Sequence, residues 1–257
     1  MIPTKLVVLL SSLVVSGAAL AQTKAPEPDY TLSYNIGAVT DYRYRGISQT
    51  ALRPALQGGA DYAHKSGFYA GTWSSTIRWI KDTPPTDRGS VEVDLYAGYK
   101  GSIGAVDGLG FDVGGLYYWY VNNNLKRATG ENANTFELYG ALTYGPATLK
   151  YSHALTTLFG TPNSENSGYL DLSATFETGM WGITLTPHVG RQWIRNTGHY
   201  TDYSLTAGKD LGDGLVVSLA VVGTNFEDRF GFPYTLVGSG SRDLGKTGLV
   251  LGVKKTF

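Results

Sequence analysis

The sequence contains no cysteine, few charged residues and no long hydrophobic run after its N-terminal segment. Without cysteine, the chain cannot form disulfides, a thiolate metal site or a cysteine nucleophile. Charged residues make up 16% of the chain, with 21 basic and 21 acidic side chains, so the charge balance gives no reason to expect a nucleic-acid partner. A membrane-spanning helix needs about 20 apolar residues, and no such run follows the N-terminal segment.

The first residues have the organisation of a secretory signal peptide. Lys5 precedes an apolar run at Leu6–Val15, and Ala19 and Ala21 provide the small residues of a cleavage site. The run is too short for a transmembrane anchor. We therefore expect a signal peptide at residues 1–21, a short exposed lead-in at residues 22–29 and a single domain at residues 30–257. Cleavage would remove Lys5 and leave a small excess of acidic charge.

Glycine, tyrosine and a two-residue alternation are what the sequence has in excess. Glycine occupies 34 of the 257 positions, against a usual share of about 7%, and there are 18 tyrosines. From Tyr30 to Arg45 the even positions are almost all apolar or aromatic, and the odd positions are mostly polar. Side chains alternate between the two faces of a strand, so the pattern predicts one long strand with an apolar face and a wet face.

Similar alternation predicts further strands of about ten residues, the length that a tilted transmembrane strand needs. They lie at Pro54–His64, Phe68–Ile77, Val91–Tyr99, Phe111–Val121, Phe136–Tyr144, Ala147–Leu158, Tyr169–Glu177, Ile183–Trp193, Tyr203–Asp210, Leu215–Val222 and Thr247–Phe257. No segment has a clear helical period. The sequence therefore predicts an all-β fold class, a transmembrane antiparallel up-and-down β-barrel of about 12 strands.

The connections between these strands alternate in length. Short turns are predicted at His64–Gly67, Gly145–Pro146, Thr178–Gly182 and Leu211–Gly214. Longer polar connections are predicted at Lys81–Ser90, Asn122–Asn134, Gly160–Gly168, Arg195–Asp202 and Gly223–Asp243. Short periplasmic turns and long extracellular loops are typical of outer-membrane barrels, whereas a soluble β-sandwich gives no reason for such regularity.

The alternation also assigns side chains to the inside or the outside of the barrel. The residues expected to line the pore are Asp41, Arg43, Arg45, Glu92, Asp94, Asp112, Glu137, Asp171 and His188. Two interpretations stay open for them: a charged constriction that selects ions, or an internal salt-bridge network that stiffens the barrel. The aromatic residues expected at the lipid–water interface are Tyr42, Tyr44, Trp119 and Trp193.

Several segments resemble the TorF family of porins. Ser33–Thr50 contains the pattern D-Y-x-x-R-G-x-S-Q, and Gly67–Ser75, Val91–Tyr99 and Gly114–Val121 follow in that family's order of motifs. The terminal Phe257 is similar to the final aromatic residue that the outer-membrane assembly machinery recognises. The resemblance implies a bacterial outer-membrane barrel surrounded by lipid and lipopolysaccharide. It implies little about the transported solute.

These observations favour a porin-like channel for passive diffusion of small hydrophilic solutes or ions. A closed structural or adhesive barrel that acts through its extracellular loops is the second hypothesis, and an outer-membrane enzyme is the third. The single His-x-Ser segment, His64–Ser66, lies in a predicted periplasmic turn, far from the outer leaflet, so we expect no catalytic residue. The four histidines are scattered, and we expect neither a metal nor another cofactor.

Overall fold

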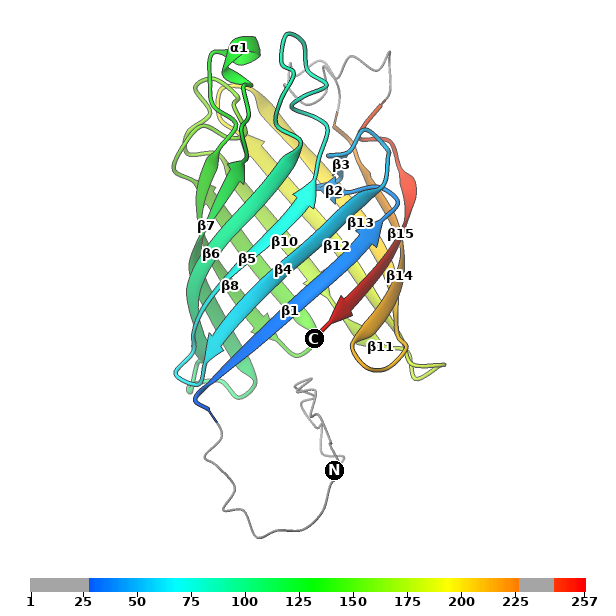
Figure 1. The fold of residues 1–257 in the computed structure, drawn as a ribbon. Coiled ribbons are helices and arrows are strands. Elements are labelled where there is room, and N and C mark those ends of the chain that lie inside the picture. Colours follow the sequence, from blue (N-terminus) through cyan, green and yellow to red (C-terminus); the bar gives the residue numbers. More distant parts are fainter. Residues whose placement is uncertain (1–27, 227–242) are drawn as a thin grey trace.

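Twelve antiparallel strands close into a barrel in the computed structural model, which describes residues 28–226 and 243–257 (Figure 1). Each wall strand pairs with the next one along the chain, and the ring closes where the last strand, β15, pairs with the first, β1. The predicted fold class is confirmed. The predicted signal peptide, its cleavage site at Ala19 and Ala21, and most of the lead-in lie outside the described residues.

The strands of the wall have nearly the predicted positions. They are β1 (Tyr30–Val39), β4 (Ala55–His64), β5 (Phe68–Thr76), β6 (Val91–Ser102), β7 (Leu109–Tyr120), β8 (Thr135–Tyr144), β9 (Ala147–Ala154), β10 (Gly168–Ala174), β11 (Phe176–Glu177), β12 (Ile183–Ile194), β13 (Gly198–Asp210), β14 (Leu215–Thr224) and β15 (Gly248–Thr256). Strands β10 and β11 both pair with β12 and form one interrupted wall strand. Among the described residues, no helix is long and apolar enough to span a membrane.

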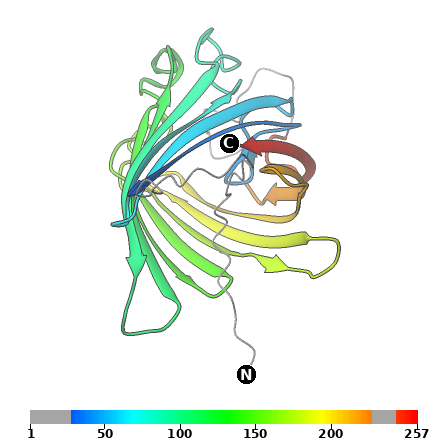
Figure 2. The same cartoon turned by 60° about the horizontal axis from the view of Figure 1, so that its bottom comes forward.

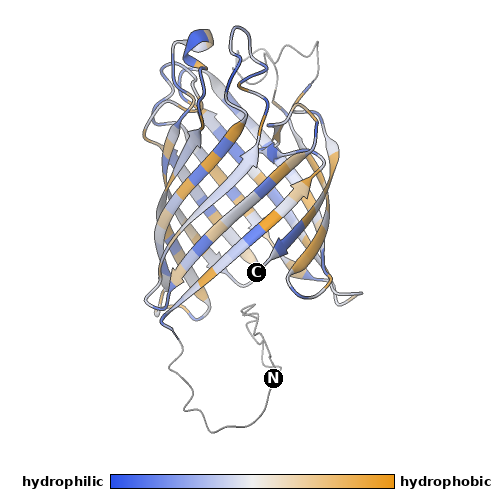
Figure 3. Cartoon of the chain, viewed as in Figure 1, coloured by the Kyte–Doolittle hydropathy of each residue, from blue (hydrophilic) through white to orange (hydrophobic). Residues whose placement is uncertain are grey.

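Polar and apolar residues alternate along the strands of the wall (Figure 3), and large apolar side chains of these strands are exposed on the outer surface. Leu32, Ile36 and Leu56 are more than half exposed. A continuous surface of such residues is too large to face water and is typical of a surface that contacts lipid or a partner. Their neighbours in sequence point inward, as the pleat of a strand requires. The predicted aromatic residues Trp119 and Trp193 also lie on the outer face, each with 43% of its surface exposed.

Tyrosine rings packed over glycines explain why both residue types are abundant. Tyr139 on β8 lies opposite Gly114 on β7, and a Cβ at Gly114 would be 2.5 Å from the tyrosine hydroxyl. Tyr96 on β6 covers Gly71 on β5 in the same way, with its ring 2.5 Å from the position of a Cβ. Only glycine leaves room for such a ring beside the sheet, so these tyrosines lie against the inner wall.

The two ends of the barrel differ, as predicted. Short turns join the strands at the end where the C-terminus lies, and longer connections join them at the opposite end, which also carries helix α1 (Lys126–Thr129) (Figures 1 and 2). One of the predicted long connections is wrong. Arg195–Asp202 is not a long loop, because β13 begins at Gly198 and leaves only residues 195–197 between the strands. Most of the predicted connection Gly223–Asp243 lies outside the described residues.

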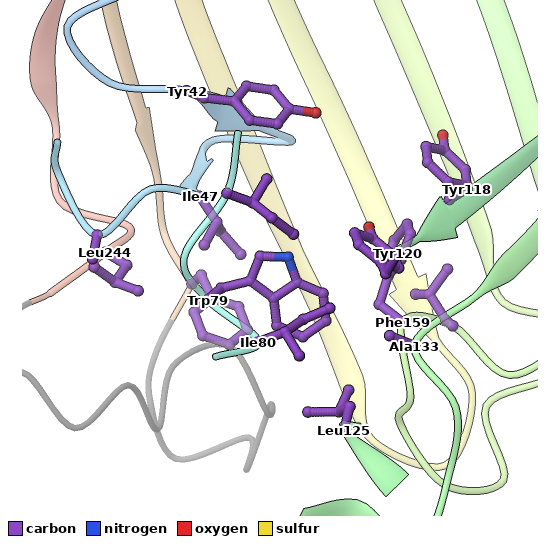
Figure 4. Close-up of a cluster of buried hydrophobic side chains, with 14 of the residues drawn as sticks. Tyr42, Ile47, Trp79, Ile80, Tyr118, Tyr120, Leu125, Ala133, Phe159 and Leu244 are labelled. Atoms are coloured by element: carbon purple, nitrogen blue, oxygen red, sulfur yellow. The ribbon is translucent and has the colours of Figure 1, made fainter. Parts of the chain in front are cut away.

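The first strand is shorter than its alternation predicts, and this changes the interior. Strand β1 ends at Val39, and the chain then turns into the barrel, where β2 (Arg43–Tyr44) pairs with β3 (Ile47–Ser48). The prediction that Tyr42 and Tyr44 face the lipid–water interface is therefore wrong. Tyr42 is only 8% exposed and belongs to a buried cluster inside the loop end of the barrel (Figure 4). We call residues 40–54, which contain β2 and β3, the inner hairpin.

Candidate functional site

The inner hairpin is held in shape by Asp41. The Asp41 carboxylate accepts hydrogen bonds from the hydroxyls of Ser48 at 2.5 Å and Thr50 at 3.0 Å, and it forms an ion pair with Arg43. The turn between β2 and β3 consists of Arg45 and Gly46, with φ angles of 45° and 80°. Two successive positive φ angles are typical of the tight turns that join paired strands, and a residue other than glycine seldom adopts one.

The Arg45 side chain, at the tip of the inner hairpin, extends across the lumen to the opposite wall. Its guanidinium donates to both carboxylate oxygens of Glu137 on β8, at 2.8 and 3.0 Å, and to the side-chain oxygen of Gln192 on β12 at 2.5 Å. The rings of Tyr44 and Tyr169 lie 4.8 and 4.2 Å from the guanidinium carbon. Burial opposes the charge of Arg45, but Glu137 and the surrounding tyrosines together outweigh burial and raise the pKa of Arg45, so this side chain stays ionised.

Close packing fixes the turn against β13 and β14. A Cβ added to Gly46 would lie 2.7 Å from the Cβ of Asp202 and 2.9 Å from the carbonyl oxygen of Gly223. Such distances leave no room for any other residue. The inner hairpin thus starts at β1, packs its turn against β13 and β14, and reaches β8 and β12 through the Arg45 side chain, which narrows the barrel at this depth.

A polar cavity of about 380 Å³ adjoins the tip of the inner hairpin. Its lining includes Arg43, Arg45, Lys150, Asp171, His188 and Asp202. The His188 ring lies between two acids, with Nε2 2.6 Å from Asp171 and Nδ1 3.7 Å from Asp202. Tyr169 donates to Asp202 at 3.1 Å. The lining therefore presents both signs of charge to anything that enters the cavity.

A second hollow, of about 280 Å³, lies on the side of the barrel formed by β1, β4, β14 and β15. Small or polar side chains dominate its lining, which includes Asn35, Gly37, Gln57, Ser218, Gly252 and Lys254. The wall from β5 to β8 is different, because tyrosines fill it. Tyr69 hydrogen-bonds with Tyr139 and donates to Asp112 at 2.5 Å, so the space on that side is occupied.

Apolar side chains occupy the loop end of the barrel above the cavity. Trp79, Ile80, Leu125 and Phe159 are nearly inaccessible to solvent and come from three different connections, together with residues of the inner hairpin (Figure 4). Trp79 packs edge-on against Tyr120 with ring centroids 5.3 Å apart. The long connections therefore form a packed core inside the mouth, which restricts access from that end.

The predicted pore-lining residues all lie inside the barrel, but they belong to two groups. Glu92, Asp94, Asp112, Glu137, Asp171 and His188 project from wall strands, whereas Asp41, Arg43 and Arg45 belong to the inner hairpin. Sequence reasoning missed Lys150, Tyr169 and Asp202. Asp202 was placed in a loop, although its alternation with Tyr203 and Ser204 continues the polar face of β13 and could have identified it.

The alternative of an enzyme gains no support from the described residues. His64 and Ser66 are 2.7 Å apart in the turn after β4, but none of the described acids forms an ion pair with His64. His153 contacts Tyr151 and Asn166 at 3.3 Å on the outer side of β9. The described residues contain no group of three or more side chains that could hold a metal ion.

A closed antiparallel barrel with an apolar outside and a charged inside is the fold of porins, and comparison with solved structures agrees. A structure of the KdgM porin has a TM-score of 0.55 at 8% identity, with 88% of this chain and 99% of that chain covered. A structure of the NanC porin has a TM-score of 0.53 at 12% identity, covering 88% and 98%. A structure of the KdgM porin in complex with disordered oligogalacturonate has a TM-score of 0.53 at 8% identity, with the same coverage as NanC.

The chain belongs to the Gcw_chp family, described as a bacterial protein of unknown function, whose model matches residues 23–257. No match was found among curated proteins. Neither the family description nor the solved structures name the TorF family, so that resemblance stays a prediction.

Proposed function

We propose that the protein is an outer-membrane channel through which small hydrophilic solutes or ions diffuse passively. The observation that carries this proposal is a charged, partly hollow interior inside a closed barrel whose outer surface is apolar. A purely structural barrel of twelve strands has no need for a 380 Å³ cavity lined by both signs of charge. The similarity to the KdgM and NanC porins supports the same fold.

The inner hairpin would set the size and charge selectivity of the channel. Arg45 and Glu137 neutralise each other across the lumen, while Arg43 and Lys150 line the adjoining cavity. A passing ion would therefore meet fixed charges at the narrowest depth, which is how rings of charged side chains select ions. The sequence left two roles open for these residues, a charged constriction and a salt-bridge network that stiffens the barrel. In this proposal the same residues have both roles.

A closed barrel that acts through its loops is the second candidate. The observation that favours it is the packed apolar cluster inside the loop end, which includes Trp79 and Phe159. In either case we expect an exported protein in a bacterial outer membrane, surrounded by lipid and lipopolysaccharide. We further expect its insertion to depend on the assembly machinery through the C-terminal strand that ends at Phe257.

Conductance across a planar lipid bilayer separates the two candidates. The purified, refolded protein should give discrete, small current steps in potassium chloride, and neither buffer nor heat-denatured protein should give them. A liposome-swelling assay should then rank solutes, with a neutral monosaccharide beside oligogalacturonate, the ligand of one similar structure. Folded protein that inserts without any current would reject the channel and leave the closed barrel.

A further inference from the structure

One arginine lies on the outer face of the barrel wall. On β12, Val189 and Trp193 are 46% and 43% exposed, and side chains alternate along a strand, so Arg191 shares their outer face. The other cations on the outer face of the described strands are Lys209 and Lys255, and each lies one residue from the short-turn end of its strand. Arg191 is unlike them, and an arginine that faces lipid is destabilising unless it lies near the interface.

The Arg191 guanidinium has a neutral partner but no acid. Its Nη1 donates a hydrogen bond to the hydroxyl of Thr201, the cross-strand neighbour on β13, at 2.7 Å. Among the described residues, no carboxylate forms an ion pair with Arg191. Strand β12 ends three residues later at Ile194, on the side of the long connections, so Arg191 lies toward the level of the lipid headgroups. An anion is the partner that this arginine lacks.

An apolar hollow of about 330 Å³ lies on the same outer face, and we call it the outer hollow. Its lining comes from β7 to β10 and includes Val113, Gly140, Tyr151 and Leu170. Gly140 leaves this space open, because the nearest atom to a Cβ added there would be a Val113 methyl carbon 4.0 Å away. Leu170 at the edge of the outer hollow is the cross-strand neighbour of Arg191, so the two features adjoin.

The outer hollow lies deeper in the membrane than Arg191. Val113 is the fifth of the twelve residues of β7, counted from the short-turn end, and Arg191 is the ninth of the twelve residues of β12. Polar groups gather instead at the level of Arg191. The Tyr151 ring covers Gly168, toward the loop end of β10, and the Tyr151 hydroxyl is 3.3 Å from Nδ1 of His153. A polar edge therefore adjoins an apolar hollow beneath it.

We propose that this face binds a phosphorylated glycolipid, lipopolysaccharide, with a phosphate of its lipid A part at Arg191 and an acyl chain in the outer hollow. A guanidinium matches the geometry of a phosphate and carries the opposite charge, and an acyl chain gains by leaving a polar edge for an apolar surface. The choice of this lipid rests on the proposed outer-membrane location, with the long connections outside. The site itself lies outside the barrel and does not require that the barrel conduct.

Native mass spectrometry of the full-length protein, refolded in detergent, tests the site. We expect one bound molecule of bisphosphorylated lipid A for each protein. The same lipid without its phosphates should bind about tenfold more weakly, since charge-assisted hydrogen bonds to phosphate are lost. Equal binding of the two lipids would overturn the proposal. Phosphatidylglycerol should also bind more weakly than lipid A, and equal or tighter binding would reject lipopolysaccharide as the occupant.

Two variants separate the two parts of the site. Arg191→Gln should abolish the preference for the phosphorylated lipid, and Arg191→Lys should retain part of it. Gly140→Leu should weaken the binding of both lipids and keep the preference, because the added side chain fills the outer hollow. An unchanged preference in Arg191→Gln would overturn the phosphate site, and unchanged affinity in Gly140→Leu would overturn the acyl-chain site.

Lys209→Gln is the matched control, because it removes an exposed cation from the outer face of β13 at the opposite end of the barrel. This variant should bind both lipids as the unchanged protein does, and a loss equal to that of Arg191→Gln would mean that phosphate is attracted without a defined site. Heat-modifiable migration checks folding. Arg191→Gln removes a charge from the lipid-facing surface and should fold, so it decides if Gly140→Leu does not fold.

Discussion

At the scale of single residues, the interior depends on pairing charges where water is scarce. The Arg45 guanidinium and the Glu137 carboxylate are only 6% and 2% exposed, with 2.8 Å between them. Removing one partner of such a pair is costly, because the other charge stays buried without compensation. The exposed pair of Lys65 and Asp29, at 3.1 Å, has the same chemistry in water and makes a suitable comparison.

The first prediction is that Arg45→Gln destabilises the barrel by about 3–5 kcal/mol, since it leaves Glu137 unpaired. Glu137→Gln in the same chain should recover a large part of this loss, because both charges are then gone. Urea unfolding in detergent, followed by tryptophan fluorescence, measures the free energy of unfolding. Lys65→Gln is the control and should change stability little, since exposed ion pairs contribute little. A double variant no more stable than Arg45→Gln would show that the pair is not what stabilises the hairpin.

At the scale of elements, the wall could be predicted from the sequence and the inner hairpin could not. Alternation marks a strand with two different surroundings, and β1, β6 and β12 follow it closely. The same alternation continues through Tyr42 and Tyr44 after β1 has ended at Val39. An aromatic ring suits a lipid boundary and a buried cluster equally well, so local pattern alone cannot distinguish the two. The difference arises from contacts distant in sequence, such as Arg45 with Glu137 and Tyr42 with Glu92.

The second prediction is that Gly46→Ala unseats the inner hairpin and leaves the wall intact. The added Cβ would meet Asp202 at 2.7 Å and Gly223 at 2.9 Å, and the residue has a φ of 80°, which alanine adopts at a cost of about 1 kcal/mol. We expect heat-modifiable migration to persist while bilayer conductance becomes larger or noisier. Gly104→Ala is the matched control, since nothing lies within 4 Å of a Cβ there. Conductance identical to that of the control would mean that the hairpin does not restrict the lumen.

At the scale of the whole molecule, one seam joins the two ends of the chain. Strand β15 pairs with β1 from Asn35 opposite Thr256 to Val39 opposite Gly252, whereas β1 pairs with β4 along its entire length. Phe257 extends this seam, because its backbone N–H donates to the Tyr34 carbonyl at 2.8 Å and its carbonyl accepts from the Tyr34 N–H at 3.2 Å. The terminal residue therefore closes the barrel as well as ending the chain.

The third prediction is that deleting Phe257 impairs closure more than changing its side chain does. The deletion removes two backbone hydrogen bonds of the seam, each contributing about 0.5–1.5 kcal/mol. The backbone N–H and carbonyl of Tyr34 then lose their partners on this side. In vitro refolding into lipid vesicles, without assembly machinery, should be slower for the deletion and nearly unchanged for Phe257→Ser. In cells, both variants should accumulate less in the outer membrane if the assembly machinery recognises the aromatic side chain of Phe257. Normal refolding of the deletion would mean that the seam closes without its last residue.

The tyrosines that cover glycines on β5 to β8 have a consequence for the geometry of the interior. They thicken one half of the inner wall, while small residues such as Gly37, Ser218 and Gly252 leave the other half thin. The free space is therefore eccentric: one hollow lies beside β9, β10, β12 and β13 and another beside β14, β15 and β1, whereas tyrosines occupy the side from β5 to β8. Enlarging a side chain on the thin half narrows the route, whereas enlarging a glycine on the thick half forces the rings apart. A larger side chain would thus change permeation on the side lined by small residues, and would impair folding on the side filled by tyrosines.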